Sequence, residues 1–131
     1  IGNLLLHLEG NVRQWIISGL GGAPDQRQRE REFAERGPIP RSLLLARLRK
    51  TVTAACRVIG KLPPRDLERT YRIQGFRVSG VQALMHATEH FAHHSGQIIL
   101  LTKLVRGKDL GFTHLPGQKA GTAGRKNLPA I

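Results

Sequence analysis

The feature that most constrains the fold is a histidine-rich segment from Ser79 to Gly107, SGVQALMHATEHFAHHSGQIILLTKLVRG. Ser79 and Gln82 match a capping box, in which the serine hydroxyl accepts a hydrogen bond from a backbone N–H and the glutamine side chain reaches back. Gly107 follows a basic last turn and marks the end of the helix. Because no proline interrupts the segment, it predicts one helix of about 27 residues, ~40 Å long at ~1.5 Å per residue.

Polar side chains of this helix share one stripe at ~100° per residue. The stripe consists of His86, His90, His94 and Gln97 and continues to Leu101. Apolar side chains run beside it and form the face that must pack against other helices. The histidines therefore lie at the border of the buried face instead of in open solvent, which makes them the candidate functional residues.

Two further helices are predicted from apolar residues at i, i+3 and i+4 spacing. The first runs from Ile1 to about Ser18 and carries His7 at the flank of its apolar face. The second runs from Pro40 or Arg41 to about Gly60, and a short extended pair follows between Leu67 and Val78. The chain is therefore predicted to be all-α, with a short extended segment before the last helix.

The sequence also predicts the structure at both ends of the chain. The first helix begins at residue 1 without a capping residue, although its large apolar face needs neighbours. We therefore expect a further helix that precedes Ile1. Residues 113–131 lack periodicity and are rich in glycine, lysine and proline, which predicts an irregular tail after a helical domain of residues 1–112.

The segment from Gly19 to Pro40 alternates in charge and shows no apolar period. Such a pattern is typical of a solvated loop or a single helical turn, here with Phe33 as an apolar anchor. The alternative is that the residues from Asp25 to Glu32 line the mouth of a pocket.

The composition bounds the class of protein. A chain of 131 residues forms one small domain with one core. No apolar run approaches the ~18–20 residues of a membrane span, and the N-terminal residues lack the basic leader of a signal peptide. A single cysteine, Cys56, excludes internal disulfides and fits a cytoplasmic location. Its four-residue spacing from Leu44, Leu48 and Val52 predicts that it is buried.

The formal charge of +12 predicts an attraction to anions. Nucleic acid is the less favoured partner, because the basic residues are dispersed from Arg13 to Lys126 and few aromatic side chains are present to stack on bases. A small anionic substrate fits the same charge without a dense basic patch.

The histidine spacing is typical of a metal site. Imidazole is a common ligand for Zn, Ni, Fe and Cu, and two histidines at i and i+4 can reach one ion. Both His86–His90 and His90–His94 have this spacing, but residues eight apart lie ~12 Å apart along the axis, too far for one ion. A third ligand must come from another helix, where His7 is available. The alternative is a polar cluster or a pH-sensitive patch at the edge of the core.

Two segments, IGNLLLHLEGNVRQWI and HATEHFAHHSGQIILLTKL, resemble the DinB-like superfamily of metalloenzymes, most closely a bacterial branch of unknown function. The resemblance implies a four-helix bundle that often dimerises and holds a divalent metal with three histidines. It assigns the ligands to His7, His90 and His94. The candidates for orienting these ligands or a bound water are His86, Gln97 and Asn11.

The resemblance also implies a function. Three histidines leave coordination positions for water or substrate, which is the pattern of catalytic sites. The expected ion is Zn²⁺ or Ni²⁺, with Fe or Mn as alternatives. The expected activity is that of a metal-dependent thiol S-transferase or hydrolase, a homodimer acting with a low-molecular-weight thiol. The first helix of the superfamily precedes the early histidine, and the arginine common after the last histidine is Ser95 here. The alternative is a non-catalytic helical interaction or dimerisation module.

Overall fold

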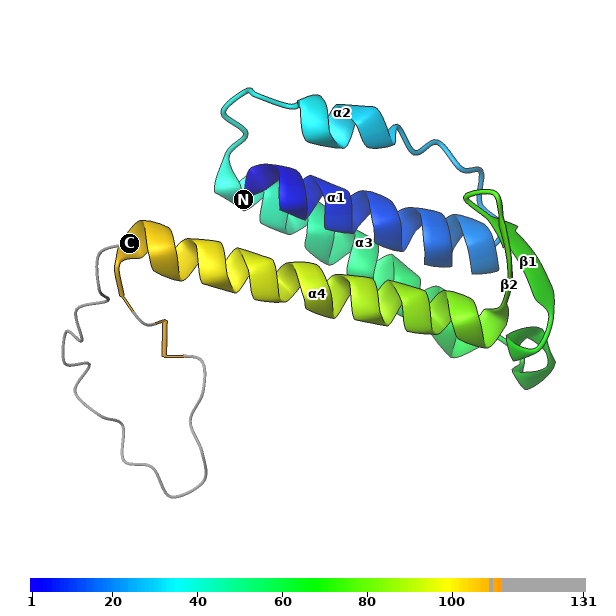
Figure 1. Ribbon diagram of the computed structural model, residues 1–131. Helices are drawn as coiled ribbons and strands as arrows, with labels where there is room; N and C mark the ends of the chain where they lie inside the picture. Colours follow the sequence, from blue (N-terminus) through cyan, green and yellow to red (C-terminus); the bar gives the residue numbers. More distant parts are fainter. Residues whose placement is uncertain (109, 112–131) are drawn as a thin grey trace, which may run out of the picture.

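The computed structural model describes residues 1–108 and 110–111. Its long helices lie side by side, and a short helix lies over the first of them (Figure 1). The prediction of a mostly helical fold with an extended pair before the last helix is confirmed. The long elements are α1 (Gly2–Val12), its π-helical continuation η1 (Arg13–Leu20), α3 (Arg41–Lys61) and α4 (Gly80–Arg106). The short elements are α2 (Arg29–Ala34), the 3₁₀ turn η2 (Pro64–Leu67), β1 (Thr70–Ile73) and β2 (Phe76–Ser79).

The helix α4 begins and ends where the sequence predicts. The Ser79 hydroxyl accepts a hydrogen bond from the backbone N–H of Gln82 at 3.2 Å, and the Gln82 side chain accepts one from the Ser79 N–H at 2.8 Å. At the other end Gly107 is left-handed, with φ 60°, a conformation that glycine adopts without a Cβ clash. Local chemistry therefore fixes both ends of the helix that carries the histidine stripe.

A two-stranded hairpin connects α3 to α4 at one end of the molecule (Figure 1). Its strands pair antiparallel, and the turn between them uses Gln74 and Gly75, both with positive φ, as a tight hairpin turn requires. Ile73 is 3% exposed and lies against Gly19 of η1, so the hairpin closes that end of the core.

The core lies where η1 meets α3, α4 and the hairpin. The spacing of apolar residues predicts a helix to about Ser18, but it does not distinguish the wider π-helix of η1 from an α-helix. Besides Trp15 and Ile16, η1 buries the amide of Gln14. A polar side chain thus enters the protein beside its apolar core. The buried core residues are Val12, Trp15, Ile16, Leu20, Ala55, Ile73, Ala83 and Ala87.

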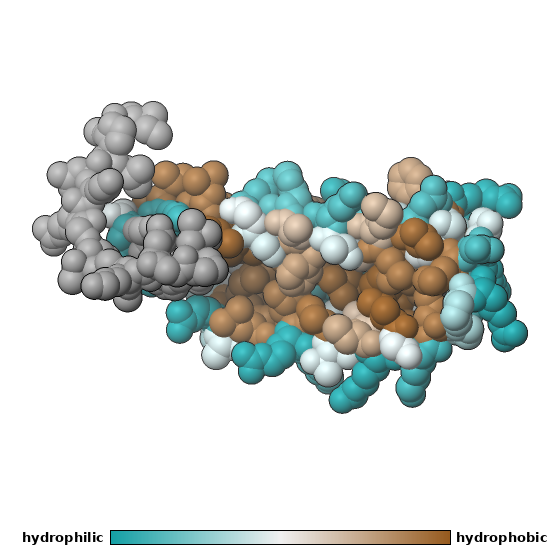
Figure 2. Space-filling model, turned by 90° about the horizontal axis from the view of Figure 1, so that it is seen from below, coloured by the Kyte–Doolittle hydropathy of each residue, from teal (hydrophilic) through white to brown (hydrophobic). Residues whose placement is uncertain are grey.

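The helices α3 and α4 both pack against the α1–η1 helix and hardly touch each other. An open apolar groove of about 170 Å³ lies between them, and Figure 2 shows apolar side chains gathered along this face. The described residues thus form three long helices and one of 6 residues, and a four-helix bundle is not confirmed. The groove is lined by Val12, Ile16, Val52, Ala55, Ile59, Leu84, Ala87, Thr88 and Phe91.

The apolar face of α1 is buried at Leu8 but only half-buried at Leu4 and Leu5. The described residues therefore do not cover this face fully, and the expected helix before Ile1 stays a prediction. The division into a domain of residues 1–112 and a tail of residues 113–131 also stays a prediction, because residues 112–131 lie outside the described part of the chain.

The prediction that Cys56 is buried is wrong, because its side chain is exposed. The buried side of α3 runs through Leu44, Thr51 and Ala55. Beyond Leu44 it therefore falls one residue before Val52 and Cys56, the positions that the four-residue spacing placed inside. Within the described residues, no helix combines the length and the apolar character that crossing a membrane needs.

Candidate metal centre

Three histidines from two helices meet at the contact between α1 and α4. His7 comes from α1, and His90 and His94 come from successive turns of α4. One ring nitrogen of each lies within 4.8 Å of the others. His7 is 5% exposed, and the other two are partly buried. The set that the sequence proposed, one histidine from the first helix and an i, i+4 pair from the last, is therefore brought together.

The distances in this cluster suit a metal ion. The Nε2 atoms of His7 and His90 are 3.0 Å apart. A tetrahedral ion with Zn–N bonds of ~2.0–2.1 Å separates its ligand nitrogens by about 3.3–3.4 Å, so the two rings need to move apart by only a few tenths of an ångström. Nδ1 of His90 is buried without a hydrogen-bond partner among the described residues. Among the described residues, Nε2 of His7 is therefore the hydrogen-bond partner of the His90 ring, and Nδ1 of His90 has none.

Gln97 holds the third histidine. Its side-chain oxygen lies 2.6 Å from Nδ1 of His94, and its nitrogen lies 3.1 Å from Nε2 of His93. Because an amide oxygen only accepts, His94 must donate through Nδ1, which leaves a lone pair on its Nε2. Gln97 thus contacts a candidate ligand directly, and its role in orienting that ligand stays a prediction. His93 is exposed and lies outside the cluster.

His7 contacts a carboxylate from a distant part of the sequence. Its Nδ1 lies 2.9 Å from Oε2 of Glu32, in α2, and the phenyl ring of Phe33 lies 4.8 Å from its ring. Arg27 donates to both oxygens of Glu32, at 2.8 Å and 2.9 Å. The side chains of Arg27 and Glu32 are 3% and 10% exposed, so this ion pair is a buried one.

The charges in the cluster follow from burial and from these hydrogen bonds. Burial, together with the neighbouring imidazoles of His94 and His7, lowers the pKa of His90 to about 4. Burial also lowers the pKa of His7, against the opposing effect of its hydrogen bond to Glu32. For Glu32, burial raises the pKa, but the hydrogen bonds from Arg27 and His7 outweigh it and keep the pKa below its usual value. At neutral pH, His7 and His90 are therefore neutral, which is the form that binds metal ions.

His86 does not join the cluster, although it lies one turn before His90 on the same stripe. Its ring stacks on the indole of Trp15, with 3.7 Å between ring centroids and 28° between planes. Nδ2 of Asn11 lies 3.4 Å from its Nε2, and burial lowers its pKa. An amide nitrogen only donates, so the Nε2 lone pair of His86 faces Asn11 rather than the cluster. Among the described residues, His86 and Asn11 thus contact each other and form no hydrogen bond with a candidate ligand, and their predicted role of orienting a ligand or a bound water stays a prediction.

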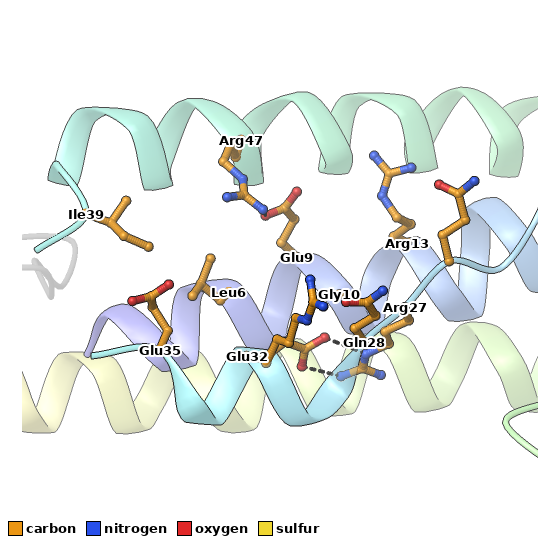
Figure 3. Close-up of a pocket in the computed structure, with 12 residues that line it drawn as sticks. Leu6, Glu9, Gly10, Arg13, Arg27, Gln28, Glu32, Glu35, Ile39 and Arg47 are labelled. Carbon is orange, nitrogen blue, oxygen red and sulfur yellow. Dashed lines mark hydrogen bonds and ion pairs between the residues drawn. The ribbon is translucent and has the colours of Figure 1, made fainter. Parts of the chain in front are cut away.

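The charged segment from Gly19 to Pro40 folds against α1. Its helical turn is found as α2, but Arg27 and Glu32 are buried rather than solvated, so that part of the prediction is wrong. The alternative of a pocket lining holds for residues 26–28, 31 and 32, which line a cavity of about 450 Å³ between α1, α2 and α3 (Figure 3). The lining includes Arg27 and Glu32 but none of the three clustered histidines.

Sequence reasoning missed Glu32 and Arg27, because alternating charges carry no period that tells a buried carboxylate from a solvated one. One signal was available in Gly10, a glycine inside a helix, which is less stable there than alanine by about 1 kcal/mol. A Cβ atom at Gly10 would collide with the Glu32 carboxylate and would lie 3.0 Å from Nε of Arg27. An interior glycine one turn after His7 therefore marks the place where another side chain crosses α1.

The fold and the site define a predominantly helical protein with a three-histidine cluster that can hold a metal ion. The chain belongs to DUF1572, a family described as proteins of unknown function, which matches residues 1–119. No curated protein matches the chain, and no solved structure does. The family description does not name the DinB-like superfamily, so that resemblance stays an expectation.

Proposed function

We propose that this protein binds a divalent transition metal, Zn²⁺ or Ni²⁺, through His7, His90 and His94. One observation carries the proposal: the ring nitrogens of all three converge, while Nδ1 of His7 and Nδ1 of His94 are each held by an acceptor. An acceptor at Nδ1 fixes both the tautomer and the orientation of the ring, so Nε2 already points toward the ion. Fe and Mn remain alternatives for the ion, because the same donors accept them.

A bound ion would lower the pKa of a coordinated water or thiol and so supply a nucleophile at neutral pH. The resemblance to the DinB-like superfamily supports a thiol S-transferase or a hydrolase as the activity, and the charge of +12 supports a small anionic substrate. The residues of this chain have two tasks in this proposal. His7 and His94 present fixed nitrogens, and the partly exposed side of the cluster leaves access for a substrate.

The test is elemental analysis of the purified protein after reconstitution, beside His90→Ala and a control, His93→Ala. We expect about one metal ion per chain in the wild type and in the control, because His93 is exposed outside the cluster. The His90→Ala variant should lose the ion. Equal metal content in all three proteins, or none in the wild type, contradicts the proposal.

A second candidate function, a helical dimerisation module, is supported by the apolar groove between α3 and α4. Contiguous apolar surface is typical of interaction sites. We propose that a helix of a second copy fills this groove, which would complete a four-helix arrangement around α1. The molar mass in solution, measured by light scattering at micromolar concentration, should be that of a dimer and should fall to that of a monomer in a Phe91→Glu variant. A wild-type monomer contradicts the homodimer.

A further inference from the structure

The polar side chains around His7 form a connected network that reaches far beyond the candidate ligands. Arg27, which pairs with Glu32, also donates from Nη1 to the side-chain oxygen of Gln14 at 2.9 Å. Gln14 in turn donates to Oδ2 of Asp25 at 2.8 Å, and Oδ1 of Asp25 accepts from the Arg27 backbone N–H at 3.0 Å. Arg27, which pairs with Glu32, is therefore fixed by two further contacts, one with Gln14 of η1 and one with Asp25 of its own loop.

The hydrogen-bond geometry at His7 decides which of its nitrogens carries the proton. Nδ1 lies 2.9 Å from Oε2 of Glu32 and 3.1 Å from Nη2 of Arg27. A guanidinium only donates and an ionised carboxylate only accepts, so Nδ1 can serve one of the two. Arg27 Nη2 already donates to Oε2 of Glu32 at 2.9 Å, whereas Oε2 is the one acceptor that Nδ1–H can reach in the described part of the chain. His7 therefore carries its proton on Nδ1, and Nε2 keeps its lone pair toward His90.

The Glu32 side chain packs across α1 at Gly10, and this packing depends on the absence of a side chain there. The Glu32 carboxylate occupies the space that a Cβ atom would take at Gly10. The same absence of a side chain leaves room for the guanidinium, since a Cβ there would also lie 3.0 Å from Nε of Arg27. A larger residue at position 10 must displace the carboxylate and hence its contact with His7.

We propose that Glu32, clamped by Arg27, is a positioning residue that fixes His7 as the Nδ1–H tautomer and presents its Nε2 to the metal ion. This inference rests on the proposed metal site. It extends that site to a buried carboxylate that no spacing of histidines indicates. Outer partners of metal-bound histidines typically raise metal affinity by about 10–100-fold, so the charged segment from Asp25 to Glu32 becomes part of what determines affinity.

The experiment compares metal affinity and the tautomer of His7 in the wild type and in Glu32→Leu. We expect the metal Kd of Glu32→Leu to rise by about 10–100-fold, and Glu32→Gln, which keeps an acceptor oxygen, to lie between the two. Glu35→Gln is the matched control, since Glu35 follows the same short helix and its carboxylate accepts from the Gly37 backbone N–H. An unchanged Kd in Glu32→Leu overturns the proposal and leaves Glu32 a structural ion-pair partner.

The tautomer is read from ¹⁵N chemical shifts of the histidine side chains in the metal-free protein. We expect His7 to be protonated on Nδ1 in the wild type and to lose this preference in Glu32→Leu. This readout needs no metal, so it separates the two proposals. A wild type that binds no metal but holds His7 as Nδ1–H refutes the metal site and retains only the control of the His7 tautomer by Glu32. A wild-type His7 protonated on Nε2 refutes the positioning role whatever the metal content.

Gly10→Ala provides a second variant in case Glu32→Leu does not fold. This variant replaces none of the hydrogen-bonding residues. It adds one methyl group in the space that the Glu32 carboxylate occupies. We expect Gly10→Ala to weaken metal binding and to remove the preference of His7 for protonation on Nδ1. These losses are expected although alanine has the higher helix propensity. A Gly10→Ala protein with wild-type affinity and the Nδ1–H tautomer contradicts the proposed crossing.

Discussion

Two clusters, one of three histidines and one of a single histidine with its neighbours, lie next to each other where the α1–η1 helix contacts α4, and they differ in a way that spacing does not reveal. In the first cluster, His7, His90 and His94 turn ring nitrogens toward one point. In the second, His86 stacks on Trp15 and faces the amide of Asn11. Burial lowers the pKa of His7, His86 and His90 alike. Neither burial nor pKa therefore separates a candidate ligand from a packed histidine.

What separates the clusters is the partner that each ring receives from elsewhere in the chain. Glu32 and Gln97 supply acceptor oxygens to Nδ1 of His7 and His94, which frees the opposite nitrogens. Asn11 supplies a donor to His86 and occupies its lone pair. For His7 and His94, the hydrogen-bond partner of the far ring nitrogen, in addition to the position on the helix, determines which nitrogen is free to bind a metal.

The largest expected effect comes from removing one histidine of each cluster. We expect His7→Gln to lose the metal ion and His86→Gln to keep about one ion per chain, because only the first removes a converging nitrogen. His86→Gln should instead lower the free energy of unfolding, by about 0.5–1.5 kcal/mol for the lost ring stacking. Elemental analysis and urea denaturation of both variants make the comparison, and loss of metal in His86→Gln would contradict it.

The sequence predicted more of the fold than of the site. The Ser79 capping box and Gly107 fixed the ends of α4, and the i, i+4 spacing together with the resemblance selected His7, His90 and His94. The partners of these histidines could not be found in the same way. Glu32 meets His7 across 25 positions of the chain, and such a contact depends on how the charged segment packs over α1. The register of α3 failed at Cys56 because the buried side includes Thr51, a polar residue that a spacing of apolar residues does not select.

The next effect in size concerns pH. The pKa of His90 is lowered to about 4 from 6.5, so between these values the unfolded chain binds a proton that the folded chain does not. Stability is then fully present above about pH 6.5 and falls as the pH drops toward about 4, by on the order of 3 kcal/mol at most. The lowered pKa values of His7 and His86 act in the same direction. Urea denaturation of the metal-free protein at several pH values measures this loss.

His90→Gln sharpens the pH comparison between the clusters. We expect this variant to show a flatter loss of stability toward acid than His86→Gln, because the deeper desolvation of His90 is removed with the ring. The measurement uses metal-free protein, since a bound ion competes with protons for the same nitrogens. A pH profile that His90→Gln leaves as steep as the wild type would contradict this assignment.

The smallest effect is expected from the two amides that serve the clusters. Gln97→Leu removes the acceptor at 2.6 Å from Nδ1 of His94 and should weaken metal binding by about 10-fold, the lower end for an outer partner. Asn11→Leu should leave the metal Kd unchanged. Asn11→Leu removes the unpaired buried Oδ1 and also the donor to Nε2 of His86, so these opposing effects should leave the free energy of unfolding little changed.

The ratio of these two effects is the closest test of the comparison, because the two substitutions are chemically alike and both remove an amide that contacts a histidine. Competition with a metal indicator gives the Kd of each variant, and urea denaturation shows whether the fold is retained. If Asn11→Leu weakens metal binding as much as Gln97→Leu, the second cluster contributes to the site, and the partners of the far ring nitrogens are not what separates the two. If only Gln97→Leu weakens it, the acceptor oxygens define the site, and Glu32 is expected to have the same role at His7.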